Sequence, residues 1–92
     1  MMNNERRNDG LTLYFNERLE ELSGYFWTTL EDIVADIYHA FHAEVECDVL
    51  DATREYIVVG WVEDDEDVQW EIKLGGTERT ITIESFEEVY RG

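Results

Sequence analysis

The clearest periodic pattern in the chain is a set of apolar residues at helical spacing in its second third. Positions i, i+3, i+4, i+7, i+8 and i+11 of this segment are Leu30, Ile33, Val34, Ile37, Tyr38 and Phe41. A stripe of this kind covers one side of a helix and faces a core. Thr28 and Glu31 have the spacing of a capping box, which marks a helix start. The pattern predicts an amphipathic helix over residues 29–43.

The segment before this helix fits two patterns. A strand-like alternation is formed by Leu11, Leu13 and Phe15. A near-helical spacing is formed by Leu11, Phe15, Leu19, Leu22 and Phe26. We predict a helix that ends at Ser23-Gly24, because glycine adopts the left-handed conformation that closes a helix. The preceding residues 1–10 are polar and end in an Asp9-Gly10 turn signal, so we expect a flexible lead-in followed by one domain over residues 11–92.

After Glu46 the apolar period changes to two, which is typical of strands. We predict strands over residues 56–63, 68–74 and 79–84, with a turn at Gly75-Gly76-Thr77, and a short further strand over residues 47–50. Residues 56–63 are apolar at both alternating sets of positions. This suits either a central strand covered on both faces or a strand in a dimer contact.

The last residues show helix signals again. Ser85 and Glu88 repeat the capping-box spacing, and Phe86, Val89 and Tyr90 lie on one side of a helical projection. We therefore predict a short C-terminal helix. The expected fold class is α+β, with N-terminal helices packed on one face of a three- to four-stranded antiparallel β-meander.

The charge of the chain narrows its possible partners. Its 92 residues carry 23 Asp and Glu against 7 Lys and Arg, a formal net charge of −16. Nucleic acid and anionic lipid both require a basic surface, so we exclude direct binding to either. Residues 1–30 are nearly neutral at −2, while residues 31–60 and 61–92 carry −7 each. Solubility needs a smaller excess, so this charge calls for another explanation.

Composition indicates a folded protein without secretion features. The hydrophobic fraction of 43% is too high for a disordered acidic tail. A single cysteine, Cys47, cannot form an internal disulfide. No apolar stretch has the length of a signal peptide core or a membrane span. We expect a cytoplasmic monomer or homodimer, in the host cytoplasm if the protein is viral.

Two acidic groups raise the question of a metal site. Residues 63–67 are five consecutive acids, but an EF-hand loop requires a glycine at its sixth position and a glutamate at its twelfth, and the sequence lacks both. Asp32, Asp36 and His39 lie on one helical stripe, which in so acidic a chain indicates a solvated face. We predict no metal site.

Catalytic signatures are also missing. Cys47 follows His39 and His42, but we favour the interpretation that it is a small hydrophobic side chain at a helix-to-strand junction. The sequence contains no phosphate-binding glycine loop, no GxSxG elbow and no HExxH motif. We predict that the protein is not an enzyme and binds no cofactor.

The acids themselves are the candidate site. Carboxylates four apart on a helix are about 6 Å apart along its axis, and alternate strand residues about 6.7 Å, each close to two phosphate steps of DNA. We expect a surface that binds a basic protein, with Tyr25 and Tyr56 as exposed anchors. The predicted contact residues are Glu63, Asp64, Asp65, Glu66, Asp67, Asp32, Asp36, Asp48 and Asp51.

In size and composition the chain resembles phage-encoded nucleic-acid mimics, such as anti-CRISPR and anti-restriction proteins. It also resembles small nuclease immunity proteins. The first resemblance implies an inhibitor that imitates phosphates and blocks the basic groove of a nucleic-acid-handling protein. The second implies an immunity protein or antitoxin that neutralises a basic nuclease. A third reading is a generic binding module with a halophilic surface, although the near-neutral first third argues against it. No site residue is carried over from either family.

Overall fold

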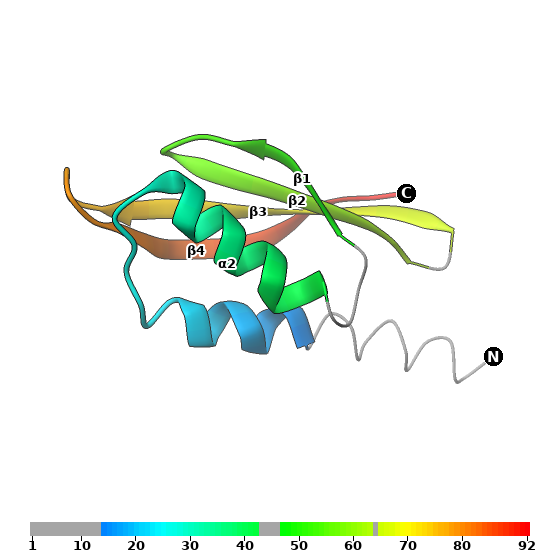
Figure 1. Cartoon of the computed structure of the whole chain (residues 1–92). Helices are drawn as coiled ribbons and strands as arrows, with labels where there is room; N and C mark the ends of the chain where they lie inside the picture. Colours follow the sequence, from blue (N-terminus) through cyan, green and yellow to red (C-terminus); the bar gives the residue numbers. More distant parts are fainter. Residues whose placement is uncertain (1–13, 43–46, 64) are drawn as a thin grey trace.

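The computed structural model describes residues 14–42, 47–63 and 65–92, and within these it contains two helices and a four-stranded antiparallel sheet (Figure 1). The first helix is described over residues 14–22. The second, α2, spans Leu30–His42, and the strands are β1 (Asp48–Ala52), β2 (Tyr56–Glu63), β3 (Glu66–Gly76) and β4 (Ile81–Arg91). They pair in the order β1-β2-β3-β4, which confirms an α+β class with a meander. The predicted lead-in over residues 1–10 lies outside the described residues.

Most predicted elements are present with small shifts in their ends. The bounds of α2 and β2 agree with the helical stripe and with the apolar run. The first helix stops at Ser23-Gly24, where the Ser23 amide donates to the Leu19 carbonyl at 2.8 Å. The predicted left-handed conformation of Gly24 is wrong, because Gly76 is the described glycine with a positive φ. Strand β1 extends to Ala52, beyond the predicted end at Leu50, and β3 is longer than predicted at both ends.

The predicted C-terminal helix is wrong, because residues 85–90 belong to β4. Two bulges explain the misleading pattern. The β3–β4 register shifts at Glu84 and again at Val89. At each of these two residues the regular alternation of β4 side chains between the two faces is interrupted. A bulge adds one unpaired residue and moves the following side chains to the other face. Ile83 and Phe86 consequently lie on the same face although they are three residues apart, which imitates helical spacing.

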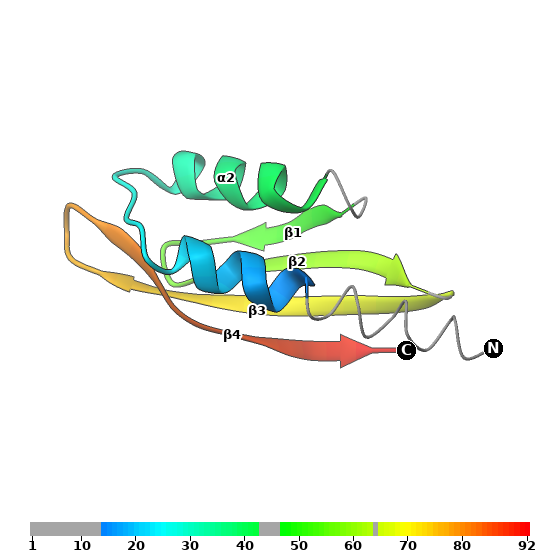
Figure 2. The ribbon, with the colours of Figure 1, turned by 90° about the horizontal axis from the view of Figure 1, so that it is seen from below.

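One face of the sheet, here called the inner face, carries the core. Its buried side chains include Ile57, Val59, Trp61, Val68, Trp70, Ile72, Ile81 and Ile83. Phe15 of the first helix stacks on Trp61, with ring centroids 4.0 Å apart and planes 7° from parallel. Ile33 and Ile37 of α2 join the same core. Helix α2 lies beside β1 (Figure 2). Burial of these large side chains is the main stabilising contribution in a domain of this size.

The opposite face, here called the outer face, is largely exposed. Val62 of β2 is 65% exposed and Leu50 of β1 is 52% exposed. Tyr56 and Val58, on the same face, are half-buried by their neighbours in the sheet. The alternative in which β2 is covered on both faces is therefore not met, because the outer side chains of Tyr56 and Val58 are half-buried and that of Val62 is exposed. The other alternative, that β2 lies in a dimer contact, stays a prediction.

One end of the sheet is closed by Arg54, in the β1–β2 turn. Its guanidinium donates to the carbonyls of Gly75, Thr77 and Thr80 in the β3–β4 turn, at 3.2, 2.7 and 3.0 Å. Gly76 has a φ of 110°, where an added Cβ would lie 2.3 Å from the Thr80 carbonyl oxygen, so this turn requires glycine. Among the described residues, no helix is long and apolar enough to cross a membrane.

Candidate interaction surface on the outer face of the sheet

A row of acidic residues crosses the outer face from edge to edge. The residues in register across the four strands are Asp51, Val58, Glu71 and Glu87, so the row has acids on β1, β3 and β4 and a valine on β2. Glu71 and Glu87 are directly opposite each other on β3 and β4, and neither makes an ion pair within the described residues. Like charges in such a cross-strand pair destabilise a sheet. The row is therefore a feature that the fold itself does not need.

A bulge in β1 adds a second acid to this face. The β1–β2 register shifts at Leu50, so Asp48 pairs with Gly60 and Asp51 with Val58, both on the outer face. In a regular strand, residues three apart would lie on opposite faces. The bulge thus places Asp48 and Asp51 together, and Leu50 between them covers Gly60.

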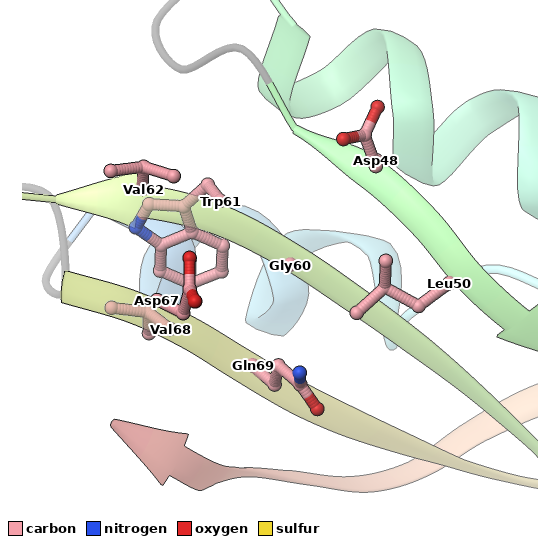
Figure 3. A pocket seen from close by; sticks show the side chains of 8 residues that line it. All are labelled: Asp48, Leu50, Gly60, Trp61, Val62, Asp67, Val68 and Gln69. Carbon is pink, nitrogen blue, oxygen red and sulfur yellow. The ribbon is translucent and has the colours of Figure 1, made fainter. Parts of the chain in front are cut away.

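Gly60 forms the floor of a shallow hollow on the outer face, with a volume of about 150 Å³ (Figure 3). The hollow is lined by Asp48, Leu50, Gly60, Trp61, Val62, Asp67, Val68 and Gln69. Asp48 on β1 and Asp67 on β3 lie on opposite sides of Gly60, which is on β2 between them (Figure 3). The hollow therefore combines an apolar floor with two carboxylates at its rim.

Two polar contacts at the Tyr56 end of the outer face compensate part of its charge. The Tyr56 hydroxyl donates to Asp51 Oδ2 at 3.0 Å, and this bond to the carboxylate raises the pKa of the Tyr56 phenol above its usual value. Lys73 Nζ lies 3.7 Å from Glu84 Oε1. Both contacts are exposed, so they contribute little to stability.

The first of the five predicted hairpin acids, Glu63, is buried on the inner face with 4% of its surface exposed. Its Oε1 accepts a hydrogen bond from the Trp61 indole at 3.1 Å, and its Oε2 lies 3.4 Å from Arg91 Nη1. Arg91 also contacts Glu66 at 3.6 Å and Glu88 at 2.7 Å. The hydrogen bond to Glu88 is the main reason that the pKa of Arg91 is raised. The charge of Glu63 is used inside the fold and is not available to a partner.

The rest of the predicted hairpin cluster divides between the tip and the outer face. Asp65 is exposed at the tip with a φ of 66°, in the left-handed region. Asp67 follows on β3, where its backbone pairs with Gly92 at 2.7 and 3.0 Å and its side chain lines the hollow. Asp64 lies outside the described residues.

The two predicted helix acids are not part of the outer face. Asp36 accepts a 2.6 Å hydrogen bond from the indole of Trp27, which is buried. Asp32 is exposed in the first turn of α2, where its amide bonds to the Thr29 hydroxyl. The strand register places Asp48, Asp51 and Asp67 on the outer face, whereas Asp32 and Asp36 belong to α2, whose Ile33 and Ile37 are part of the core.

The sequence pattern missed several residues of the outer face. Glu87 and Tyr90 were assigned to a helix, and they lie in register with Glu71 and Gln69. Tyr90 is 51% exposed. Of the two predicted anchors, Tyr25 is exposed, at 63%, in the loop before α2, and Tyr56 is half-buried on the outer face. The sequence pattern does place Glu71 on the outward side of its strand. Its pairing with Glu87 could not be predicted, because that requires the register of β4.

Two further kinds of site, a reactive cysteine and a metal centre, find little support outside this surface. Cys47 is buried, and burial is the main reason that the pKa of its thiol is raised, which disfavours the thiolate. Within the part of the chain that the structure describes, no three His, Cys, Asp or Glu side chains are grouped as metal ligands would be.

No protein-family model, curated protein or solved structure matches this chain.

Proposed function

We propose that this protein is a small acidic inhibitor that imitates the phosphates of a nucleic acid. It binds the basic groove of a nucleic-acid-handling protein, such as a CRISPR effector or a restriction nuclease, and excludes the nucleic acid. The observation that carries the proposal is the acidic row on the exposed outer face, formed by Asp51, Glu71 and Glu87, in which Glu71 and Glu87 are opposite each other without an ion pair among the described residues.

The geometry of a sheet suits this role. Neighbouring strands are about 4.8 Å apart and alternate residues about 6.7 Å, so acids on one face form a fixed two-dimensional array. Asp67 and Glu71 on β3 are four residues apart, about 13 Å, which is close to four phosphate steps of a DNA strand. A basic groove that binds phosphates at these intervals meets carboxylates in their place and releases its own counterions.

The energetic cost of the row supports a functional reading. Glu71 and Glu87 face each other without a cation between them, although Lys73 is two residues from Glu71 on the same face. A sheet selected for stability alone gains from an opposite-charge pair at this position. In our proposal both helices cover the inner face, and the outer face is left for the partner.

A second candidate function is an immunity protein or antitoxin that neutralises a basic nuclease. The exposed apolar side chains among the acids favour it, namely Leu50, Val62 and Tyr90. Protein interfaces commonly place such anchors at the centre and charges around them. In this case the apolar anchors, rather than the acidic row, carry most of the affinity.

The test is a competition assay with purified CRISPR effectors, restriction nucleases and nuclease toxins, each bound to its fluorescent nucleic acid. We expect the protein to displace the nucleic acid from at least one of them, and less effectively as salt rises. The variant Glu71→Gln/Glu87→Gln should lose about tenfold or more in affinity at low salt. The control Glu31→Gln/Glu78→Gln removes the same charge elsewhere and should change affinity by less than about threefold.

Two outcomes contradict the proposal. One is that no member of the panel releases its nucleic acid. The other is that the row variant and the control variant weaken binding equally. If Leu50→Ser and Tyr90→Ala abolish inhibition of a nuclease toxin while the row variant does not, the immunity function is supported instead.

A further inference from the structure

We propose that the hollow above Gly60 is a socket for one arginine side chain of the partner's basic groove. This inference rests on the proposed function and deepens it, because it names the chemical group that the outer face recognises. The socket consists of the apolar residues Leu50, Gly60 and Val62 and the polar residues Asp48, Asp67 and Gln69.

The size of the hollow comes from the missing side chain at Gly60. A Cβ at this position would lie 2.8 Å from Leu50 Cδ1 and 3.3 Å from the Val68 carbonyl oxygen. Glycine therefore lets Leu50 lie close to the sheet while a space of about 150 Å³ stays open beside it. A cavity of about this volume takes a group the size of a benzene ring. A guanidinium with its last methylene groups is of comparable size.

Charge complementarity selects a cation. Asp48 pairs with Gly60, and Asp67 lies one strand further and two residues along, so their Cα atoms are about 12 Å apart. Their side chains line the hollow from its two sides (Figure 3). Neither carboxylate makes an ion pair within the described residues. A neutral group in the hollow would leave both of them without a counter-charge in a drier environment.

The shape of the hollow favours arginine over lysine. A guanidinium is planar, has five N–H donors in a fork and is weakly hydrated, so it can lie on an apolar floor and still donate to two sides. Gln69 adds an amide oxygen that can accept a further hydrogen bond. The ammonium group of lysine is compact and strongly hydrated, and it cannot reach both rim carboxylates at once.

A second copy of this chain fits the hollow poorly. The outer face that it would present carries the same acids, and the whole chain has a net charge of −16. A phosphate-bearing ligand is repelled for the same reason. An arginine from a groove that ordinarily binds phosphates meets both the charge and the shape of the hollow.

The experiment uses the full chain labelled with ¹⁵N and three short peptides, hexaarginine, hexalysine and hexacitrulline. We expect hexaarginine to shift the amide signals of Gly60, Leu50 and Gln69 more than those of α2. Hexaarginine should bind at least about threefold more tightly than hexalysine, and hexacitrulline should not bind measurably.

Two variants separate the socket from general charge attraction. Asp48→Asn/Asp67→Asn should weaken hexaarginine binding about tenfold, whereas the control Glu31→Gln/Glu78→Gln should change it less than about twofold. Gly60→Ala changes the volume of the hollow and no charge, and it should reduce the preference for arginine over lysine. Circular dichroism of each variant confirms that the fold is retained.

The inference is overturned if the shifts centre on another surface, if hexalysine binds as well as hexaarginine, or if the control variant weakens binding as much as the rim variant. These outcomes are distinct from failure of the proposed function. Peptide binding in the hollow with no displacement of nucleic acid contradicts the mimicry and leaves the socket in place. Displacement of nucleic acid that is unaffected by Asp48→Asn/Asp67→Asn contradicts the socket and leaves the mimicry in place.

Discussion

The acids of the inner and outer faces of the sheet have opposite surroundings. On the inner face, Glu63 and Glu88 contact Arg91, and Glu63 also accepts from the Trp61 indole. On the outer face, Glu71 and Glu87 are directly opposite each other and make no ion pair among the described residues. Glu63 and Glu88 are thus compensated by a cation, whereas Glu71 and Glu87 are not, and on the outer face Glu84 alone of the described glutamates has a contact with a lysine. This contrast distinguishes acids that stabilise the protein from acids that are free to act on a partner.

The contrast also shows where the few cations of the chain are used. Arg91 at the end of β4 contacts three glutamates, and through them it ties β4 to the β2–β3 hairpin. Arg54 bonds to backbone carbonyls rather than to acids. Arg54 and Arg91 thus hold the two ends of the sheet together, whereas Glu71 and Glu87 at the centre of the outer face have no ion-pair partner among the described residues.

The largest expected effect comes from removing the inner-face cation. Arg91→Met leaves Glu63 buried beside Trp61 without its counter-charge. Loss of one partner of a buried pair costs 3–5 kcal/mol, and because the Arg91 side chain is 28% exposed we expect about 2 kcal/mol here. Urea unfolding followed by tryptophan fluorescence measures the change in the free energy of unfolding.

The control for this experiment is Arg79→Met, which removes an exposed arginine in the β3–β4 turn. It should change the free energy of unfolding by less than about 0.5 kcal/mol. The double variant Glu63→Gln/Arg91→Met should recover a large part of the loss, because it removes the unpaired charge. Equal losses in Arg79→Met and Arg91→Met would show that the inner-face pair does not stabilise the fold.

The helix acids extend the same contrast to α2. Asp36→Ala removes the acceptor of the buried Trp27 indole, so we expect a loss of about 1.5 kcal/mol in the free energy of unfolding. Asp32→Ala, one turn earlier on an exposed position, should cost about 0.5 kcal/mol through the helix dipole. Thermal unfolding by circular dichroism measures both, and similar shifts in the two variants would mean that the Trp27 hydrogen bond adds nothing.

The elements with one continuous pattern could be predicted from the sequence. The apolar stripe of α2 and the run of β2 gave bounds close to those observed, because nothing interrupts their periods. In β4 the bulges at Glu84 and Val89 reverse the inward positions twice, so that Phe86 follows Ile83 at helical spacing. A capping-box spacing at Ser85 and Glu88 then favoured a helix for a segment whose conformation is set by pairing with β3.

The candidate surface was also predicted only in part, because a local pattern identifies acidic residues but not which of them are enclosed by distant parts of the chain. The sequence analysis proposed Asp48, Asp51 and Asp67 as contact residues, and all three lie on the outer face. Which acids are enclosed depends on contacts across long sequence separations, such as Arg91 with Glu63, which no local pattern reveals. Glu87 could not be paired with Glu71 until β4 was known to be a strand.

A smaller effect is expected from breaking the like-charge pair of the outer face. Glu87→Lys places an ammonium opposite Glu71 and should raise the free energy of unfolding by about 0.5 kcal/mol at low salt. The gain should fall as salt is added. Glu78→Lys makes the same change in the exposed turn and should give a smaller increase. If Glu87→Lys is neutral or destabilising, the row has no energetic cost, and the argument that its charge is kept for a partner is lost.

The smallest effect concerns Asp51, the acid of the row that accepts a hydrogen bond from a neighbouring side chain. Because Asp51 accepts from the Tyr56 hydroxyl, the pKa of this phenol is raised above its ordinary value of 10.0. A raised pKa favours the neutral phenol in the folded state, so the stabilisation is complete below pH 10 and is lost as the pH rises through the folded-state pKa. Asp51→Asn should lower the pKa of the Tyr56 phenol. Ultraviolet absorbance against pH measures the ionisation of all tyrosines, and subtracting the titration of the Tyr56→Phe variant isolates that of Tyr56. An unchanged titration would show that Asp51 is as unpartnered as Glu71, and the contrast between the two faces would then hold for this end of the row as well.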